Sequence, residues 1–233
     1  MLTIIKKYIG QAILIDGIGP KIPFSKVVLP DDAIWFFGDS FVFGCGVEEN
    51  ETAPVCLEPL IKKKVINYGV PGSGPMMVEY QLDKLLKKHK PLAVVIDWPS
   101  FNRWQGGSML GFPIMWMPHC LDEDNVYIKY DHFGCKKVWP ELWKEYKNLI
   151  ISRQLEKDNL ALVERVREKL KDYQLVEFQY YPDSYNIKLP TPVFPFIDYG
   201  SDNMHCGPKT HMKVAEWIYD QLQQKKYTTI DTI

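Results

Sequence analysis

Four short apolar runs, each ending at a glycine or a proline, are the clearest pattern in this chain. They lie at residues 33–37, 65–68, 92–98 and 175–181, and aromatic or β-branched side chains make up much of each run. Such runs are typical of strands that are covered on both faces of a sheet. We therefore expect four strands, and a further short strand at 193–197 within a proline-rich loop.

Helical spacing of apolar residues separates these runs. The predicted helices are at 52–61, where Thr52 is a candidate N-cap, and at 76–89, 141–171 (one helix or two) and 208–224. Strands that alternate with helices imply an α/β protein with a mainly parallel sheet and helices on both of its faces. In such folds, functional groups gather at the carboxyl ends of the strands.

Two segments have no clear period. Residues 1–30 contain short apolar runs that are compatible with an edge strand or a hairpin, and residues 99–140 are rich in glycine, proline and aromatic residues. The chain has 233 residues, which suits one α/β domain with a substantial core. We therefore expect a single domain over residues 1–233, with an irregular aromatic-rich insertion at about 99–140. Its aromatic side chains either fill a core or line a cleft.

Charge and cysteine content narrow the classes of protein. With 28 basic and 29 acidic residues, the net charge is -1, which gives no reason to expect a nucleic acid or an anionic membrane as partner. No apolar run is typical of a signal peptide or a membrane span, so a cytoplasmic location is expected. Five irregularly spaced cysteines exclude a complete disulfide framework and favour reduced thiols.

The first candidate for chemistry is Ser40, which follows the strand at 33–37 and the residues Gly38 and Asp39. A serine at such a strand exit is exposed where a cleft would form. If a helix begins there, its free N–H groups point at the serine and at any oxyanion beside it. The alternative is a plain helix cap with Ser40 as the N-cap residue. Asp39 is expected to form a structural hydrogen bond in the turn.

Two further loops carry candidate residues. Residues 67–74 read Asn-Tyr-Gly-Val-Pro-Gly-Ser-Gly, and the glycines let a backbone N–H approach a ligand closely. Asp202 and His205 are three residues apart just before the last predicted helix, so the carboxylate can reach the imidazole and fix its tautomer. The predicted fold brings all three loops to one edge of the sheet.

Together, the segments GDSF, NYGVPGSG and DNMH resemble the SGNH/GDSL hydrolase family. The resemblance implies a flavodoxin-like three-layer α/β/α sandwich that cleaves esters, with Ser40 as nucleophile and Asp202 and His205 completing a catalytic triad. It also implies an oxyanion hole formed by the N–H groups of Ser40 and Gly72. The expected substrate is a small-molecule or carbohydrate ester, with a short acyl or O-acetyl group, and no cofactor or metal is expected.

The third block of the family is altered here. The family's block ends Gly-x-Asn-Asp and supplies an Asn side chain to the oxyanion, whereas this chain has Trp98-Pro-Ser-Phe-Asn102-Arg103. Asn102 lies at a suitable place beyond the strand but lacks the preceding glycine and the following aspartate. It is either the third oxyanion donor or a turn-stabilising residue. Arg103 or Ser100 could replace it, and two backbone donors could also suffice.

One alternative is a metal site within the insertion. His119, Cys120, His132 and Cys135 supply ligand types that suit zinc. An adjacent His-Cys pair, however, is unusual among zinc ligands.

The same fold is compatible with functions besides ester hydrolysis. The protein could be an acyltransferase, or a catalytically silent module that binds carbohydrate or protein. It could also be a cysteine-dependent enzyme that uses Cys45 or Cys206. Neither cysteine, however, lies at the strand exit where Ser40 lies, and both are expected to pack as small buried residues.

Overall fold

A four-stranded parallel sheet forms the middle of the protein. The structure is a computed structural model that describes residues 31–71, 73–101, 104–109, 112–116, 154–180, 189 and 191–227. The strands β1 (Ile34–Gly38), β2 (Val65–Gly69), β3 (Ala93–Asp97) and β6 (Gln174–Phe178) pair in the order β2-β1-β3-β6. All four strands predicted from the apolar runs are thereby confirmed.

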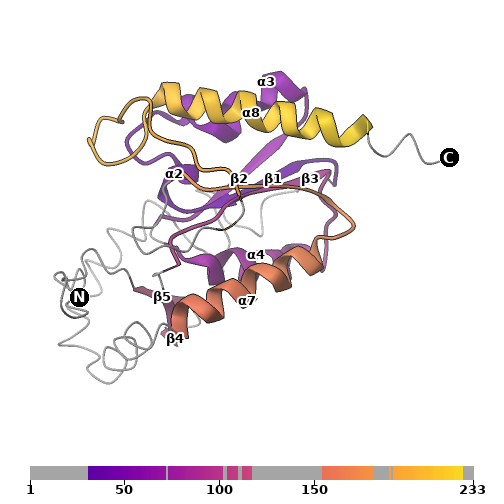
Figure 1. Cartoon of the computed structure of the whole chain (residues 1–233), viewed down its shortest axis with the longest axis vertical. Coiled ribbons are helices and arrows are strands. Elements are labelled where there is room, and N and C mark those ends of the chain that lie inside the picture. The colour runs from indigo at the N-terminus through magenta and orange to yellow at the C-terminus, as the bar shows by residue number, and fades with distance from the viewer. Residues whose placement is uncertain are drawn as a thin grey trace.

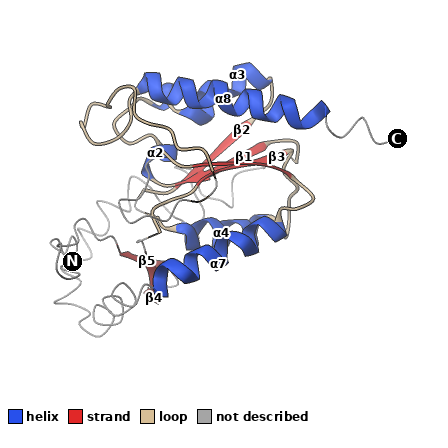
Figure 2. Ribbon diagram, viewed as in Figure 1, coloured by secondary structure: helices blue, strands red, loops and turns tan. Residues whose placement is uncertain are grey.

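Helices cover both faces of this sheet. On one face lie α3 (Ala53–Ile61) and α8 (Pro208–Tyr227), and on the other lie α4 (Pro75–Leu85) and α7 (Gln154–Lys169), as Figures 1 and 2 show. The short helices α2 (Ser40–Phe43) and η3 (Glu49–Glu51) lie between β1 and α3 in the chain. The predicted three-layer α/β/α architecture is therefore confirmed.

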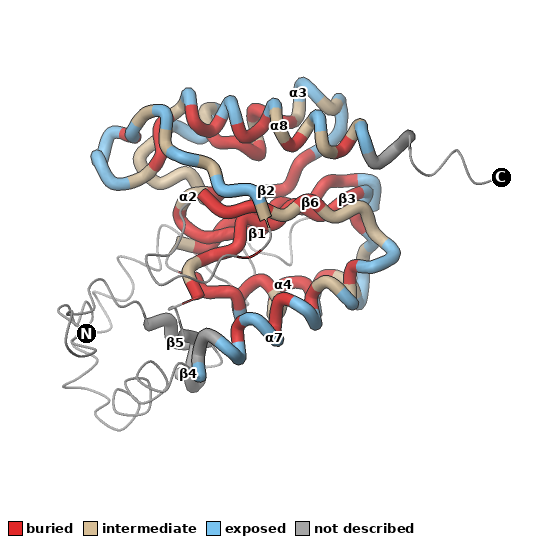
Figure 3. The backbone as a smooth tube through the Cα atoms, in the orientation of Figure 1, coloured by how far each residue is buried: buried red, intermediate tan, exposed pale blue. Residues whose placement is uncertain are grey.

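The core is divided into two layers by the alternation of side chains along the strands. In β1, Trp35 and Phe37 join the cluster that contains residues of α4 and α7. Ile34 and Phe36 point to the other face and join the cluster that contains residues of α3 and α8. All four are almost completely buried, and Figure 3 shows β1 among the buried parts of the chain. The carboxyl end of β1, which leads to Ser40, is thereby fixed from both sides.

Some boundaries differ from those predicted. Helix α4 ends at Leu85 rather than at residue 89, and Lys88 and His89 both donate to the carbonyl of Leu85 in a closing turn. The strand predicted at 193–197 is wrong, because Val193 makes only an isolated parallel bridge with Gln179. Pro195 has no N–H to continue a ladder.

Part of the segment without a period forms regular structure. The strands β4 (Trp104–Met109) and β5 (Phe112–Trp116) pair antiparallel, with a register shift between Gly106 and Ser108. The prediction for residues 1–30, and most of the predicted insertion, lie outside the described residues. Within the described part of the chain, no helix is both long and apolar enough to cross a membrane.

Candidate active site

Ser40 is the first residue of α2, directly beyond the carboxyl end of β1. Asp39 is the N-cap, and its side chain accepts a hydrogen bond of 2.9 Å from the N–H of Phe41. At the other end, Gly44 has a φ of 91° and donates to the carbonyl of Ser40 over 3.1 Å. The structural role predicted for Asp39 is confirmed. The alternative in which Ser40 caps the helix is wrong, since Asp39 holds that position.

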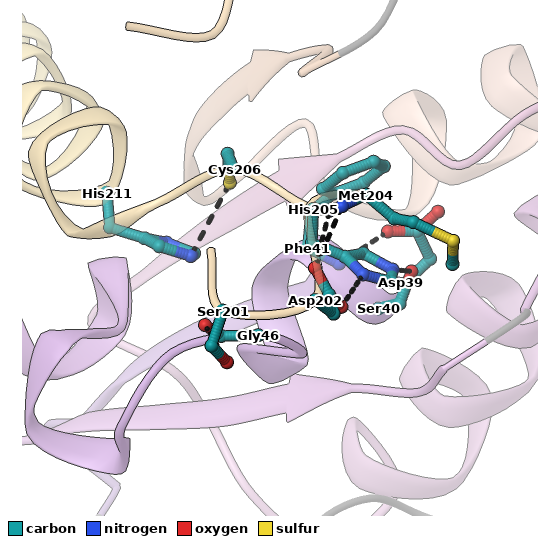
Figure 4. A network of polar contacts seen from close by, with 10 residues as sticks. All are labelled: Asp39, Ser40, Phe41, Gly46, Ser201, Asp202, Met204, His205, Cys206 and His211. Carbon is teal, nitrogen blue, oxygen red and sulfur yellow. Dashed lines mark hydrogen bonds and ion pairs between the residues drawn. The ribbon is translucent and has the colours of Figure 1, made fainter. Parts of the chain in front are cut away.

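The structure brings Ser40, His205 and Asp202 into one chain of contacts (Figure 4). His205 Nε2 lies 2.9 Å from Ser40 Oγ, and His205 Nδ1 lies 2.6 Å from Asp202 Oδ2. The other oxygen of Asp202 accepts hydrogen bonds of 3.0 Å each from the N–H groups of Met204 and His205. The carboxylate is therefore fixed by its own turn while it holds the imidazole.

The charge of Asp202 determines the tautomer of His205. Partial burial acts to raise the pKa of Asp202, but hydrogen bonds from the N–H groups of His205 and Met204, together with the contact to the imidazole, outweigh it and lower the pKa to about 2. An ionised carboxylate can only accept hydrogen bonds, so Nδ1 of His205 carries the proton. In the neutral imidazole, Nε2 is then free of a proton and can accept one from the hydroxyl of Ser40.

A narrow hairpin carries Asp202 and His205. Tyr199 and Cys206 form an antiparallel bridge, and the N–H of Gly200 donates to the carbonyl of His205 over 2.9 Å. Asn203, at the tip, adopts a left-handed φ of 55°. These backbone contacts fix the hairpin independently of the side chains that it presents to Ser40.

Gly46 is a close neighbour of Asp202 that the sequence did not identify. It has a φ of 84°, and a Cβ built there would lie only 2.7 Å from Asp202 Oδ1. Its carbonyl accepts from both the N–H and the hydroxyl of Ser201, at 2.7 and 3.0 Å. The glycine spacing was visible in the sequence, but this partner lies far along the chain. Gly46 therefore packs the hairpin directly against the segment after Ser40.

Asn67 ties the second strand to the helix of Ser40. Its Nδ2 donates to the carbonyl of Val42 over 2.8 Å, and its Oδ1 accepts from the N–H of Gly69 over 2.9 Å. The sequence analysis identified Asn67 only as the first residue of the glycine-rich segment 67–74 and predicted no contact for its side chain. The signal that pointed to this role was a polar amide within an otherwise apolar strand.

Gly72, a predicted oxyanion donor, lies outside the described residues, but its neighbours are ordered around Gly38. The N–H of Val70 and the hydroxyl of Ser73 both donate to the carbonyl of Gly38, at 3.0 and 3.3 Å. Gly38 is two residues before Ser40. The loop on either side of Gly72 is therefore attached to the strand exit that carries Ser40.

Asn102 and Arg103 also lie outside the described residues. The preceding residue, Phe101, is completely buried, and its carbonyl accepts a 2.7 Å hydrogen bond from Asn159 Nδ2 of α7. The chain after β3 is thereby held in place up to Phe101. The role of Asn102 in an oxyanion hole stays a prediction.

A buried histidine lies behind the hairpin. His211 of α8 is completely buried, and its Nδ1 accepts from the N–H of Ala53 over 3.2 Å. Nε2 must then carry the proton, and it lies 3.5 Å from Cys206 Sγ. The hydroxyl of Tyr180 lies 3.4 Å from Nδ1. Burial lowers the pKa of His211 to about 4, so this histidine is neutral near pH 7.

The two cysteines considered as nucleophiles are poorly suited to that role. Burial, followed by the nearby carboxylates of Asp202 and Asp39, raises the pKa of Cys45 to about 11. Burial also raises the pKa of Cys206 far above its ordinary value. Because the thiolate is the nucleophile, a thiol that stays protonated argues against a cysteine-dependent enzyme.

The residues of the alternative metal site, His119, Cys120, His132 and Cys135, lie outside the described residues. Within the part of the chain that the structure describes, no three His, Cys, Asp or Glu side chains gather as ligands would. The three cysteines described, at positions 45, 56 and 206, are free thiols.

Neither a protein-family model nor a curated protein sequence matches the chain, whereas solved structures match it in fold. A carbohydrate esterase, whose active site is described as having divergent catalytic and non-catalytic binding functions, has a TM-score of 0.53 and 15% identity over 86% of this chain and 68% of its own. The psychrotrophic esterase EstA from Pseudoalteromonas sp. has a TM-score of 0.46 and 12% identity over 84% of this chain and 99% of its own. The acetyl xylan esterase Est2A from the rumen bacterium Butyrivibrio proteoclasticus has a TM-score of 0.46 and 14% identity over 85% of this chain and 65% of its own. The first similarity shows that the chain shares its fold with that carbohydrate esterase, and it shows the fold alone.

Proposed function

We propose that this protein is a serine-dependent ester hydrolase of the SGNH/GDSL type, which acts through an acyl-enzyme on Ser40. The observation that carries the proposal is the pair of contacts from Ser40 Oγ to His205 Nε2 and from His205 Nδ1 to Asp202 Oδ2, at 2.9 and 2.6 Å. A nucleophile within reach of a base, which is itself oriented by a third group, is the arrangement that acyl transfer requires.

Acylation begins when His205 Nε2 takes the hydroxyl proton of Ser40 as Oγ attacks the ester carbonyl carbon. Asp202 stabilises the imidazolium that forms, because its carboxylate stays ionised. The imidazolium then gives the same proton to the oxygen of the leaving alcohol as the carbon–oxygen bond breaks. In deacylation, His205 removes a proton from water as the water oxygen attacks the acyl carbon. The imidazolium then gives this proton to Ser40 Oγ as the bond between Oγ and the acyl carbon breaks and the carboxylic acid leaves.

The proposed oxyanion hole consists of the N–H groups of Ser40 and Gly72, with the side chain of Asn102. The position of Ser40 supports its part, because the first N–H groups of a helix have no partner within the helix. The attachment of the flanks of Gly72 to Gly38 supports the second donor. Loss of one such donor typically lowers kcat by about 100- to 1,000-fold.

The substrates we propose are short acyl or O-acetyl esters of carbohydrates. The solved structure that matches this fold with a TM-score of 0.53 is that of a carbohydrate esterase, which supports the proposal at the level of substrate class. No side chain of the triad needs a metal or cofactor for the acylation and deacylation steps.

The proposal is tested by the rate of p-nitrophenyl acetate hydrolysis for wild type, Ser40→Ala and His205→Ala. His89→Ala is the matched control, since His89 lies in the turn after α4 and its imidazole lies 3.6 Å from the carboxylate of Asp31 rather than near Ser40. We expect Ser40→Ala and His205→Ala to lose about 10,000-fold or more in kcat, and the control to keep its rate. A folded wild type that turns over no ester would contradict the proposal, as would full activity of Ser40→Ala.

A further inference from the structure

Two large apolar side chains on either side of His205 are exposed. Met204, directly before His205, is 69% exposed, and Tyr199, whose backbone pairs with Cys206 directly after it, is 63% exposed. Most large apolar residues of the described chain are buried, and neighbouring exposed ones mark sites of binding more often than single ones do. Figure 4 shows Met204 and Phe41 next to the imidazole.

A continuous row of rings connects His205 to Tyr199. The edge of Phe41 packs against the imidazole with ring centroids 5.1 Å apart, Phe196 follows at 5.4 Å from Phe41, and Tyr199 at 5.6 Å from Phe196. Phe41 and Phe196, the two inner rings of the row, are half-buried. We name this surface, formed by Phe41, Phe196, Tyr199 and Met204, the aromatic track.

The position of the track indicates which part of an ester it meets. In the proposed mechanism, His205 Nε2 gives its proton to the oxygen of the leaving alcohol, so the alcohol must lie against His205. The carbonyl oxygen lies instead at the start of α2, beside the N–H of Ser40. Side chains that pack on the imidazole or belong to its hairpin therefore contact the alcohol rather than the acyl group.

We propose that the aromatic track binds the alcohol portion of the ester, that this portion is a sugar ring, and that substrate selectivity resides there. A pyranose has C–H groups on its faces and hydroxyls around its rim. It therefore matches a side chain such as that of Tyr199, with an apolar ring and a polar tip. A methionine such as Met204 adapts to irregular apolar surfaces. This inference rests on the proposed hydrolase function and assigns the specificity of the same site.

The test compares variants on esters that differ in only one half. Tyr199→Ala, Met204→Ala and Tyr199→Phe are assayed on ethyl acetate and on acetylated methyl xyloside and xylobiose, which share the acyl group. They are also assayed on p-nitrophenyl esters from acetyl to octanoyl, which share the alcohol. Met212→Ala is the control, because Met212 is an exposed methionine of α8.

For the acetylated sugars, we expect Tyr199→Ala and Met204→Ala to raise KM about 5- to 10-fold, with kcat changed by no more than about twofold. For ethyl acetate, kcat/KM of Tyr199→Ala and Met204→Ala should be unchanged, and Met212→Ala should match wild type on every ester. Tyr199→Phe keeps the ring and loses the hydroxyl, so its KM for the acetylated sugars should rise less than that of Tyr199→Ala. Along the p-nitrophenyl series, the ratio of wild type to variant should be the same for every acyl length.

Equal losses on ethyl acetate and on the sugars would overturn the inference, as would a loss that grows with acyl length. In both cases the wild type is still an esterase, so the proposed function survives. A wild type that hydrolyses none of these esters overturns the proposed function and the inference together.

Discussion

Substitution of Gly46 by alanine tests whether the position of Asp202 limits catalysis. The added Cβ would lie 2.7 Å from Asp202 Oδ1, and ordinary van der Waals contact begins at 3.4 Å. Asp202 cannot simply turn away, because its two oxygens are bound by the N–H groups of Met204 and His205 and by the imidazole. The carboxylate and the hairpin must therefore move together, by roughly 0.7 Å.

Two effects follow from this geometry. The left-handed φ of 84° costs a residue with a Cβ about 1–2 kcal/mol, and the overlap adds to this, so we expect a loss of about 2–3 kcal/mol in the free energy of unfolding. Displacement of the group that orients His205 should lower kcat about 10- to 100-fold, since misplacement by 1 Å commonly costs about 100-fold.

Gly44→Ala is the matched control. Gly44 also has a left-handed φ, of 91°, but its Cβ would meet the methyl group of Thr52 at 2.3 Å instead of Asp202. This variant should be destabilised at least as much, while its kcat per folded molecule stays within about threefold of wild type. Thermal unfolding and steady-state hydrolysis of p-nitrophenyl acetate measure both quantities. Equal falls in kcat for the two variants would refute the reasoning, as would an unchanged kcat in Gly46→Ala.

Three further predictions concern groups in and around the proposed triad. Because the pKa of Asp202 is lowered to about 2, its ionised form stabilises the fold above the unfolded pKa near 4, and this stabilisation is lost as the pH falls toward 2. Urea unfolding of Asp202→Asn should show no such loss of stability between pH 4 and pH 2, and the kcat of this variant should be about 100- to 10,000-fold below that of wild type. Because burial lowers the pKa of His211 to about 4, the folded state resists protonation, and wild type should lose stability as the pH falls from about 6.5 to 4. His211→Gln should be less stable than wild type at pH 7, but its free energy of unfolding should fall less over that pH range in the same urea assay. Asn67→Ala removes hydrogen bonds to Val42 and Gly69, so thermal unfolding should show a loss of about 2 kcal/mol in the free energy of unfolding. A variant as stable as wild type would contradict the role given to this amide.

Local composition was sufficient to predict the framework of the fold. The run at 33–37 is short and apolar on both faces, which is typical of a covered strand, and β1 occupies nearly the same residues. The strand expected at 193–197 failed because an apolar run predicts burial, whereas pairing requires N–H groups that Pro195 lacks. Helix α4 ended early because a closing turn on Leu85 stops it before the basic residues.

The contacts among Ser40, His205 and Asp202 were predictable in part for a similar reason. Asp202 and His205 are three residues apart, so their contact is local and readable from spacing. The contact between Ser40 and His205 required the parallel order of the sheet, which the alternation of strands and helices supplied. The packing of Gly46 on Asp202 was not predictable, because it depends on a left-handed turn and on two segments far apart in the chain.

The most direct test of the central claim is to find where an active-site probe attaches. Purified full-length protein is incubated with a fluorophosphonate, digested, and analysed by tandem mass spectrometry beside His205→Ala. We expect one phosphonyl adduct on Ser40 in wild type, formed much more slowly when His205 is absent. A folded wild type without an adduct on Ser40, or with the adduct on another residue such as Cys45, would contradict the assignment of Ser40 as the nucleophile.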